Sequence, residues 1–131
     1  MKIITTTIMG ILALVSSGAF AAEYDRHFDV TTDAGRAVAV YTHTKYDEAC
    51  HQSGIPRIEI ISKPEHGKAT GNQRRILITT KLIGPDCIGH TMSGLEVTYV
   101  PQKGFHGTDT FSYEVNYGNK SAQNSVTVNV K

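Results

Sequence analysis

The sequence predicts an all-β protein whose strands form an antiparallel sandwich of two sheets. Apolar and polar residues alternate with a period of two in several short segments. Such alternation is typical of strands with one buried and one solvent-facing side. Turn-forming residues separate these segments, and no long segment repeats with the period of a helix. About seven short strands separated by turns over roughly 100 residues indicate a β-sandwich.

The alternating segments are the strands that we expect, in chain order. They are residues 37–41, 57–60, 76–82, 95–99, 110–115 and 126–130. Glycine, proline and asparagine between them supply turn chemistry, for example at Ser53-Gly54, Pro64–Gly67, Ser93-Gly94 and Tyr117–Asn119. The stretch Tyr46–Gly54 is polar and is expected to be a loop.

Residues 1–21 have the pattern of a cleaved signal peptide. Lys2 is followed by an apolar stretch and then by Ala19-Phe20-Ala21, the small-x-small pattern that signal peptidase reads. The apolar stretch is shorter than the roughly 20 residues that a spanning helix needs. We therefore expect cleavage after Ala21, export to the periplasm or the medium, and no transmembrane segment in the mature chain.

Length and charge limit the remaining chain. The sequence has 131 residues, so residues 22–131 suit one domain. Lys and Arg number 13 and Asp and Glu number 12, which gives a net charge of +1. This balance offers no electrostatic case for nucleic-acid binding. The sequence contains no Gly-x-Ser-x-Gly elbow, phosphate loop or dinucleotide fingerprint, so we expect neither catalysis nor a cofactor.

Cys50 and Cys87 are the only cysteines. An exported chain meets an oxidising compartment, so we predict a disulfide between them. Redox catalysis usually needs a Cys-x-x-Cys pair, and these two residues lie far apart in the sequence.

The run from Tyr99 to Val115 carries a spaced pattern of aromatic, proline, glycine and acidic residues. Its members are Tyr99, Pro101, Gly104, Phe105, Gly107, Asp109, Phe111 and Tyr113. This run resembles the Tyr-x-Pro-x-x-Gly-Phe-x-Gly-x-Asp-x-Phe-x-Tyr signature of the bacterial Ig-like and cadherin-like modules of surface proteins. The resemblance implies an Ig-like sandwich and a role in recognition.

The conspicuous residues of this run have structural explanations. Pro101 lacks an N–H and is expected to end a strand, while Gly104 and Gly107 permit tight turns. Asp109 can accept hydrogen bonds from the backbone of the turn. Comparison with the immunoglobulin pattern makes Tyr113 a tyrosine corner, with its hydroxyl bonded to the upstream backbone. Val115 stands where an immunoglobulin has its second core cysteine, so Cys50–Cys87 is not the usual inter-sheet bridge.

The segment that ends at the second cysteine is the candidate binding loop. Its residues Gly84, Pro85, Asp86, Ile88 and His90 are loop-like and tethered by the predicted disulfide. A rigid loop loses less entropy when it binds a partner.

We therefore predict a non-catalytic exported domain that binds a protein or glycan at the bacterial cell envelope. Two alternatives stay open. One is a copper or zinc protein. A Cys50–Cys87 disulfide would bring His51 and His90 near each other in space, where these two residues and one further ligand could hold a metal, although no metal-binding spacing is present in the sequence. The other is a periplasmic inhibitor or immunity protein for a hydrolase or toxin.

Overall fold

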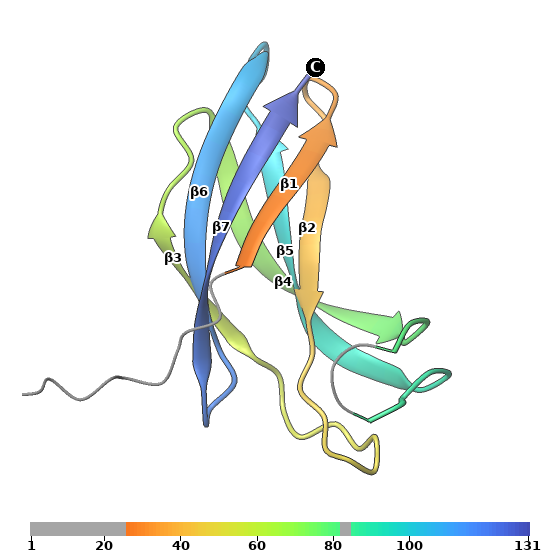
Figure 1. Cartoon of the computed structure of the whole chain (residues 1–131). Coiled ribbons are helices and arrows are strands. Elements are labelled where there is room, and N and C mark those ends of the chain that lie inside the picture. The colour runs from red at the N-terminus through yellow and green to blue at the C-terminus, as the bar shows by residue number, and fades with distance from the viewer. Residues whose placement is uncertain (1–25, 82–84) are drawn as a thin grey trace, which may run out of the picture.

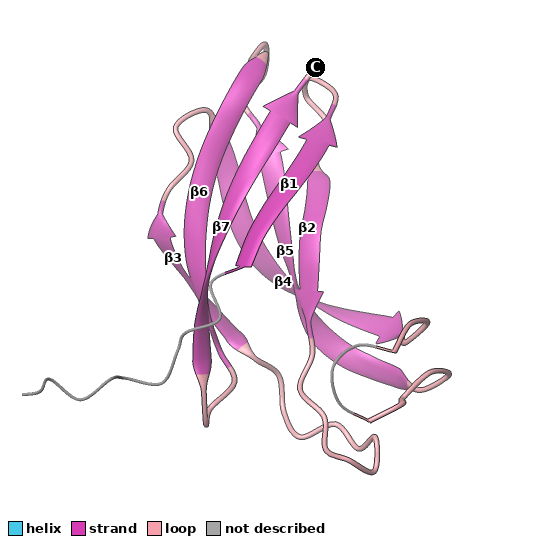
Figure 2. Cartoon of the chain, viewed as in Figure 1, coloured by secondary structure: helices cyan, strands magenta, loops and turns pink. Residues whose placement is uncertain are grey.

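The computed structural model describes residues 26–81 and 85–131, and every regular element in them is a β-strand (Figure 2). The strands are β1 (Arg26–Thr32), β2 (Val38–His43), β3 (Arg57–Ser62), β4 (Gly67–Leu77), β5 (Thr91–Pro101), β6 (Gly107–Asn116) and β7 (Ser121–Val130). The predicted signal peptide lies outside the described residues.

The strands form two sheets that pack face to face (Figure 1). One sheet has the order β1-β7-β6-β3 and the other has the order β2-β5-β4. All strand pairs are antiparallel except β1 and β7, which are parallel. Sequential strands thus alternate between the two sheets in several places, as in an Ig-like sandwich. The predicted fold class is confirmed.

The core lies between the two sheets and comes from the residues that alternate inward. Eight buried apolar side chains form one cluster, namely Val97, Tyr99, Phe111, Tyr113, Val115, Val126, Val128 and Val130. Five of the eight are valines, whose branched side chains favour strands. All eight belong to segments in which the sequence shows period-two alternation.

The prediction of a strand over residues 76–82 is wrong in its extent. Strand β4 begins at Gly67 and ends at Leu77, and residues 78–81 are not in a strand. Ile78 instead closes the base of a loop, because its N–H donates to the carbonyl of His90 at 2.9 Å. Leu82 lies outside the described residues.

The predicted turn at Ser93-Gly94 is also wrong, because both residues lie inside β5. A Cβ atom on Gly94 would lie 2.8 Å from the carbonyl oxygen of His43. The glycine therefore allows the end of β2 to approach β5 closely. A glycine within a strand often marks such an approach rather than a turn.

The two ends of the sandwich differ, and each is given a name here. The C-terminal end carries the connections 63–66 and 102–106 together with the C-terminus (Figure 1). The disulfide end carries the connections 44–56 and 117–120, and the described part of the connection 78–90 lies beside them (Figure 1).

Asp109 organises the C-terminal end. Its side chain accepts hydrogen bonds from the N–H of Glu65 at 3.1 Å and of His66 at 2.9 Å, and from the Tyr99 hydroxyl at 2.8 Å. The acceptor role predicted for Asp109 is confirmed. Two of its donors belong to the connection 63–66, however, and not to the turn between Pro101 and Gly107.

The pKa of Asp109 reflects this setting. Burial raises the pKa of the carboxyl, but the hydrogen bonds from Tyr99 and from three backbone N–H groups lower the pKa by more than burial raises it. The net pKa lies below its usual value, so the group is ionised at neutral pH. Burial and the Asp109 carboxylate raise the pKa of the Tyr99 hydroxyl.

The tyrosine-corner prediction for Tyr113 is wrong. Its hydroxyl bonds the Nε2 atom of His43 at 2.8 Å, which is a side chain of the opposite sheet. The hydroxyl that reaches an upstream backbone carbonyl is that of Tyr99, which lies 3.3 Å from the carbonyl oxygen of His66. Tyr113 lies within β6 and is fully buried, and its ring meets the ring of His43 edge-on.

The turn residues predicted in this region occupy the expected places. Strand β5 ends at Pro101. Gly104 has a φ of 82° and Gly107 a φ of 134°, values that favour glycine. Between them, the ring of Phe105 stacks on His66 with centroids 4.3 Å apart.

Candidate functional site

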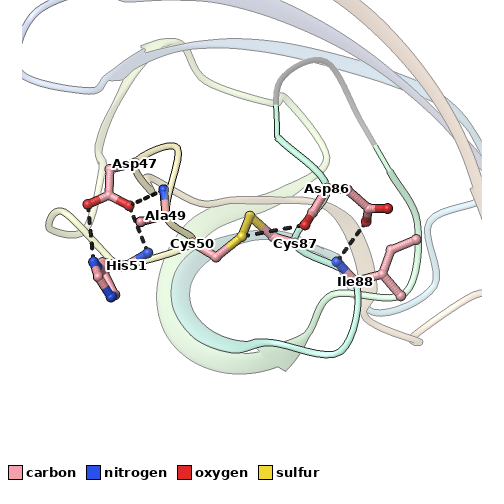
Figure 3. Close-up of a disulfide and its surroundings, with 7 residues drawn as sticks. All are labelled: Asp47, Ala49, Cys50, His51, Asp86, Cys87 and Ile88. Atoms are coloured by element: carbon pink, nitrogen blue, oxygen red, sulfur yellow. Dashed lines mark hydrogen bonds and ion pairs between the residues drawn. A yellow bond between two sulfur atoms is a disulfide. The ribbon is translucent and has the colours of Figure 1, made fainter.

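The disulfide end is built around the bond between Cys50 and Cys87, whose Cα atoms lie 5.5 Å apart (Figure 3). The predicted pairing is confirmed. Neither cysteine is in a strand, so the bond joins two connections rather than two sheets. Cys87 is only 1% exposed, so the bond is covered on that side.

The connection 44–56 is ordered by hydrogen bonds of its own. The Asp47 carboxylate accepts from the N–H groups of Ala49 and His51, both at 2.9 Å (Figure 3). This tight turn places Cys50 in the left-handed region with a φ of 62°. The Gln52 side chain then accepts from the N–H of Ser93 at 3.0 Å, which ties the loop to β5.

The candidate binding loop extends from a two-stranded arm. Strand β2 pairs with β5 only between Leu95 and Tyr99, whereas β4 pairs with β5 from Thr91 to Pro101. The arm is formed by Arg74–Leu77 and Thr91–Gly94, and it projects beyond the sandwich (Figure 1). The connection 78–90 joins its two strands.

The structure places the residues of this loop in different settings. Gly84 lies outside the described residues. Asp86 is exposed and accepts from the N–H of Ile88 at 3.2 Å. Ile88 is 51% exposed and His90 is exposed. Pro85 is one of the residues that line a cleft at the disulfide end.

This cleft has a volume of about 540 Å³. Its walls come from the start of β1, the ends of β2 and β6, the connections 44–56 and 117–120, the start of β7, and Pro85. Three tyrosines line it, namely Tyr41, Tyr46 and Tyr117. The sequence did not point to this cleft, because its walls come from segments that are far apart in the chain.

His43 connects the core to this cleft. It is 2% exposed, and its ring nitrogens lie 2.8 Å from the Tyr113 hydroxyl and 2.9 Å from the Tyr117 hydroxyl. Burial and the nearby charge of Arg26 lower the pKa of His43 to about 4. The imidazole is therefore neutral at pH 7, with one nitrogen donating and the other accepting.

The charged residues of the cleft wall are Arg26, Lys45 and Lys120, and the wall includes no Asp or Glu. Arg26 lies over the ring of Tyr41 at 5.9 Å, and Lys120 lies over the ring of Tyr117 at 5.7 Å. Within residues 26–81 and 85–131, none of these cations forms an ion pair with a carboxylate. The cleft is therefore electropositive although the whole chain is nearly neutral.

One polar atom of the cleft wall lacks a partner. Asn124 is 2% exposed, and in the part of the chain that the structure describes its Oδ1 atom accepts no hydrogen bond. Such a buried, unpaired acceptor costs about 1–3 kcal/mol. It lies on β7 opposite Tyr113 of β6.

The candidate metal ligands His51 and His90 do not gain a third partner. His51 is beside Asp47, with its Nδ1 atom 3.5 Å from the carboxylate. Among the described residues, no group of three or more His, Cys, Asp or Glu side chains could hold one metal ion. Met92, which lies near His90 in the sequence, is buried at 2% exposure.

Comparison with known families identifies the chain. The family model of the bacterial Ig domain matches residues 18–131. The chain belongs to this family. No curated protein and no solved structure matches it. Ig domains of this kind are generally non-catalytic modules, and they usually occur in surface or exported proteins. No helix in the described part of the chain is long and apolar enough to cross a membrane.

Proposed function

We propose that this bacterial Ig domain is exported after cleavage behind Ala21 and acts as a non-catalytic binding module at the cell envelope. Its binding surface is the disulfide end. The observation that carries this proposal is the covalent link between two connections beside an open cleft. Loops held in this way lose little entropy when a partner binds, so more of the contact energy remains as affinity.

The distribution of exposed apolar side chains supports the same end. Large hydrophobic residues that are exposed include Ile55, Leu77, Ile88, Ile61 and Val100. The first three lie at the disulfide end, in the connection 44–56, at the end of β4 and beside Cys87. Exposed apolar side chains at one end of a domain offer contact area to a partner. Neither the metal-binding nor the inhibitor alternative gains a specific observation in its favour.

The test compares two isoleucines of similar exposure at different places. Ile88 is 51% exposed at the disulfide end, and Ile61 is 54% exposed on β3. The protein is expressed from its full-length gene, purified after export, and titrated against the isolated cell envelope of the organism that carries the gene. We expect saturable binding that Ile88→Ser weakens by about tenfold, whereas Ile61→Ser leaves it unchanged.

Two results would refute the proposal. One is the absence of saturable envelope binding. The other is an equal loss of binding in Ile61→Ser and Ile88→Ser, which would move the contact surface away from the disulfide end. The N-terminal sequence of the exported protein tests the cleavage site in the same preparation, because a start at Ala22 is expected.

A further inference from the structure

We propose that the cleft at the disulfide end binds a saccharide that carries a carboxylate, as a uronic acid does. This inference deepens the proposed function, since it names a ligand class for the binding end. It follows from the charge of the cleft wall, from the hydroxyl donor that Tyr117 provides and from the small polar side chains of the wall.

The charge of the wall selects an anion. Lys45 and Lys120 line the cleft, no Asp or Glu lines it, and neither lysine is paired with a carboxylate in the described residues. Lys45 is half-buried, and its Nζ atom lies 3.1 Å from the position that a Cβ atom on Gly118 would occupy. The two ammonium groups thus approach the cleft from the connections 44–56 and 117–120. Hydrogen bonds from such groups to a carboxylate are stronger than neutral ones.

The hydrogen-bond direction at His43 adds a donor. Tyr113 is fully buried, and among the described residues only His43 has an atom within hydrogen-bond distance of its hydroxyl. A buried hydroxyl that donates to nothing is costly, so Tyr113 donates to the Nε2 atom of His43. The neutral ring then carries its proton on Nδ1 and donates to the Tyr117 oxygen.

This arrangement leaves the hydroxyl proton of Tyr117 free for the cleft. The Tyr117 oxygen already accepts from His43, so its own O–H points elsewhere, and Tyr117 is a wall residue. The buried chain Tyr113–His43–Tyr117 therefore presents one oriented donor beside the two ammonium groups. A carboxylate offers two acceptor oxygens for these donors.

The same wall also carries small polar side chains, namely Ser53, Ser121 and Asn119, whose hydroxyl and amide groups can both donate and accept. Sugar hydroxyls also donate and accept and are spread around the whole ring, whereas an acidic peptide donates only through its backbone N–H groups. A tyrosine-lined cleft of about 540 Å³ also suits one or two sugar rings. A carboxylated saccharide therefore fits these groups better than an acidic peptide.

The test is a titration with defined probes, followed by calorimetry or by chemical shifts. The probes are trigalacturonate, the neutral trisaccharide of galactose, and triglutamate. We expect trigalacturonate to bind at least about tenfold more tightly than the other two. We expect Lys45→Gln and Lys120→Gln each to weaken its binding by about five- to tenfold.

Lys68→Gln and Lys103→Gln are the matched controls. Both lysines are exposed and neither lines the cleft, so these variants remove the same charge elsewhere and should bind as the unaltered protein does. Unfolding curves of all four variants separate lost binding from lost folding. Tyr117→Phe removes the oriented donor and should weaken trigalacturonate binding while leaving the neutral trisaccharide unaffected.

Several results would overturn the inference. They are no binding of trigalacturonate, equal binding of the neutral trisaccharide, equal or tighter binding of triglutamate, and equal losses in the control variants. If the protein still binds the envelope in an Ile88-dependent way, only the ligand class falls. If envelope binding is absent as well, the proposed function falls with it.

Discussion

The two ends of the sandwich are held together by different means. At the C-terminal end, the Asp109 carboxylate accepts hydrogen bonds from three backbone N–H groups and from the Tyr99 hydroxyl, so both of its oxygens are paired within the chain. At the disulfide end, a covalent bond joins the connections. The cations of the cleft wall there form no ion pair with a carboxylate in the described residues, and the buried Asn124 oxygen accepts no hydrogen bond in them.

This difference separates a structural end from the end that we propose binds a partner. A buried polar network gains stability only when each member is satisfied, and Asp109 meets that condition. The disulfide provides its stabilisation mainly by restricting the unfolded chain. The lysines of the cleft wall form no ion pair within the described residues, so we propose that they are available for a ligand.

The largest expected effect is at the disulfide. Replacing both cysteines, as Cys50→Ser with Cys87→Ser, should lower the free energy of unfolding by about 4 kcal/mol, since the bond closes a long loop. Urea unfolding of the variant and of the oxidised protein measures this. Amide exchange at Glu65 and His66 should stay slow in the variant under native conditions. A change smaller than about 1 kcal/mol would show that hydrogen bonds alone hold the disulfide end.

The matching change at the other end is Asp109→Ala. It leaves the Tyr99 hydroxyl and the N–H groups of Glu65 and His66 without their acceptor. We expect the free energy of unfolding to fall by about 3 kcal/mol. The control is Asp29→Ala, since the Asp29 side chain is 71% exposed and its only ion-pair partner in the described residues is His27. Equal losses in the two variants would contradict a structural role for Asp109.

The buried histidine gives stability a distinct pH dependence. The pKa of His43 is about 4 in the folded state and 6.5 in the unfolded chain, so the unfolded state binds more protons between these values. Stability should therefore decrease as the pH falls from about 6.5 towards 4. The expected loss between about pH 7.5 and pH 5 is about 2 kcal/mol.

His43→Gln serves as the control, because it removes this titrating group. Its unfolding free energy should change less over the same pH range, although the variant is less stable at neutral pH. The contribution of Asp109 has the same sign but a lower window. Its pKa is lowered by folding, so that stabilisation is lost only below about pH 4. An equally steep decline in both proteins above pH 5 would contradict a buried, neutral His43.

The smallest effects concern the two hydroxyls bonded to His43. Tyr113→Phe removes a fully buried donor and should cost about 1–2 kcal/mol of unfolding free energy. Tyr117→Phe should cost less, about 0.5 kcal/mol, because Tyr117 is only partly buried. Thermal or urea unfolding can rank the two variants. The reverse order would mean that Tyr117, not Tyr113, supports the core.

The sequence predicts the core strands well because their signal is local. In β6 and β7 the buried residues alternate with exposed ones, and both strands face one core. The signal fails at β4, which pairs with β5 along its whole length but is mostly polar and only partly buried. In this strand Ile58 packs directly against Gly71, because its side chain lies 2.5 Å from the position that a Cβ atom would occupy. Only glycine fits there, and it adds nothing to the apolar pattern.

Strand β1 was missed for another reason. It pairs in parallel with β7, which lies almost at the opposite end of the chain. Its exposed residues His27 and Asp29 alternate with Phe28 and Val30, which pack against the core. Two apolar residues make a weak local signal, and the parallel pairing with β7 has no local signal at all.

The proposed binding end could be predicted only in part. Two cysteines in a chain that is expected to be exported are sufficient to predict the bond and the tethered loop. The cleft could not be found, because His43 and Tyr117 are 74 residues apart and two lysines in separate turns are unremarkable in a sequence. The tyrosine-corner error has the same origin, since the partner of Tyr113 lies on the opposite sheet.

The most direct test of this account maps binding onto the two ends. The exported protein, labelled with nitrogen-15, is titrated with trigalacturonate and then with solubilised envelope, while the shift of each backbone amide is followed. The account predicts that shifts concentrate in residues 44–53, 85–90 and 117–121, with little change in 63–66 and 102–106. Shifts centred on the C-terminal end, around Asp109, would contradict it.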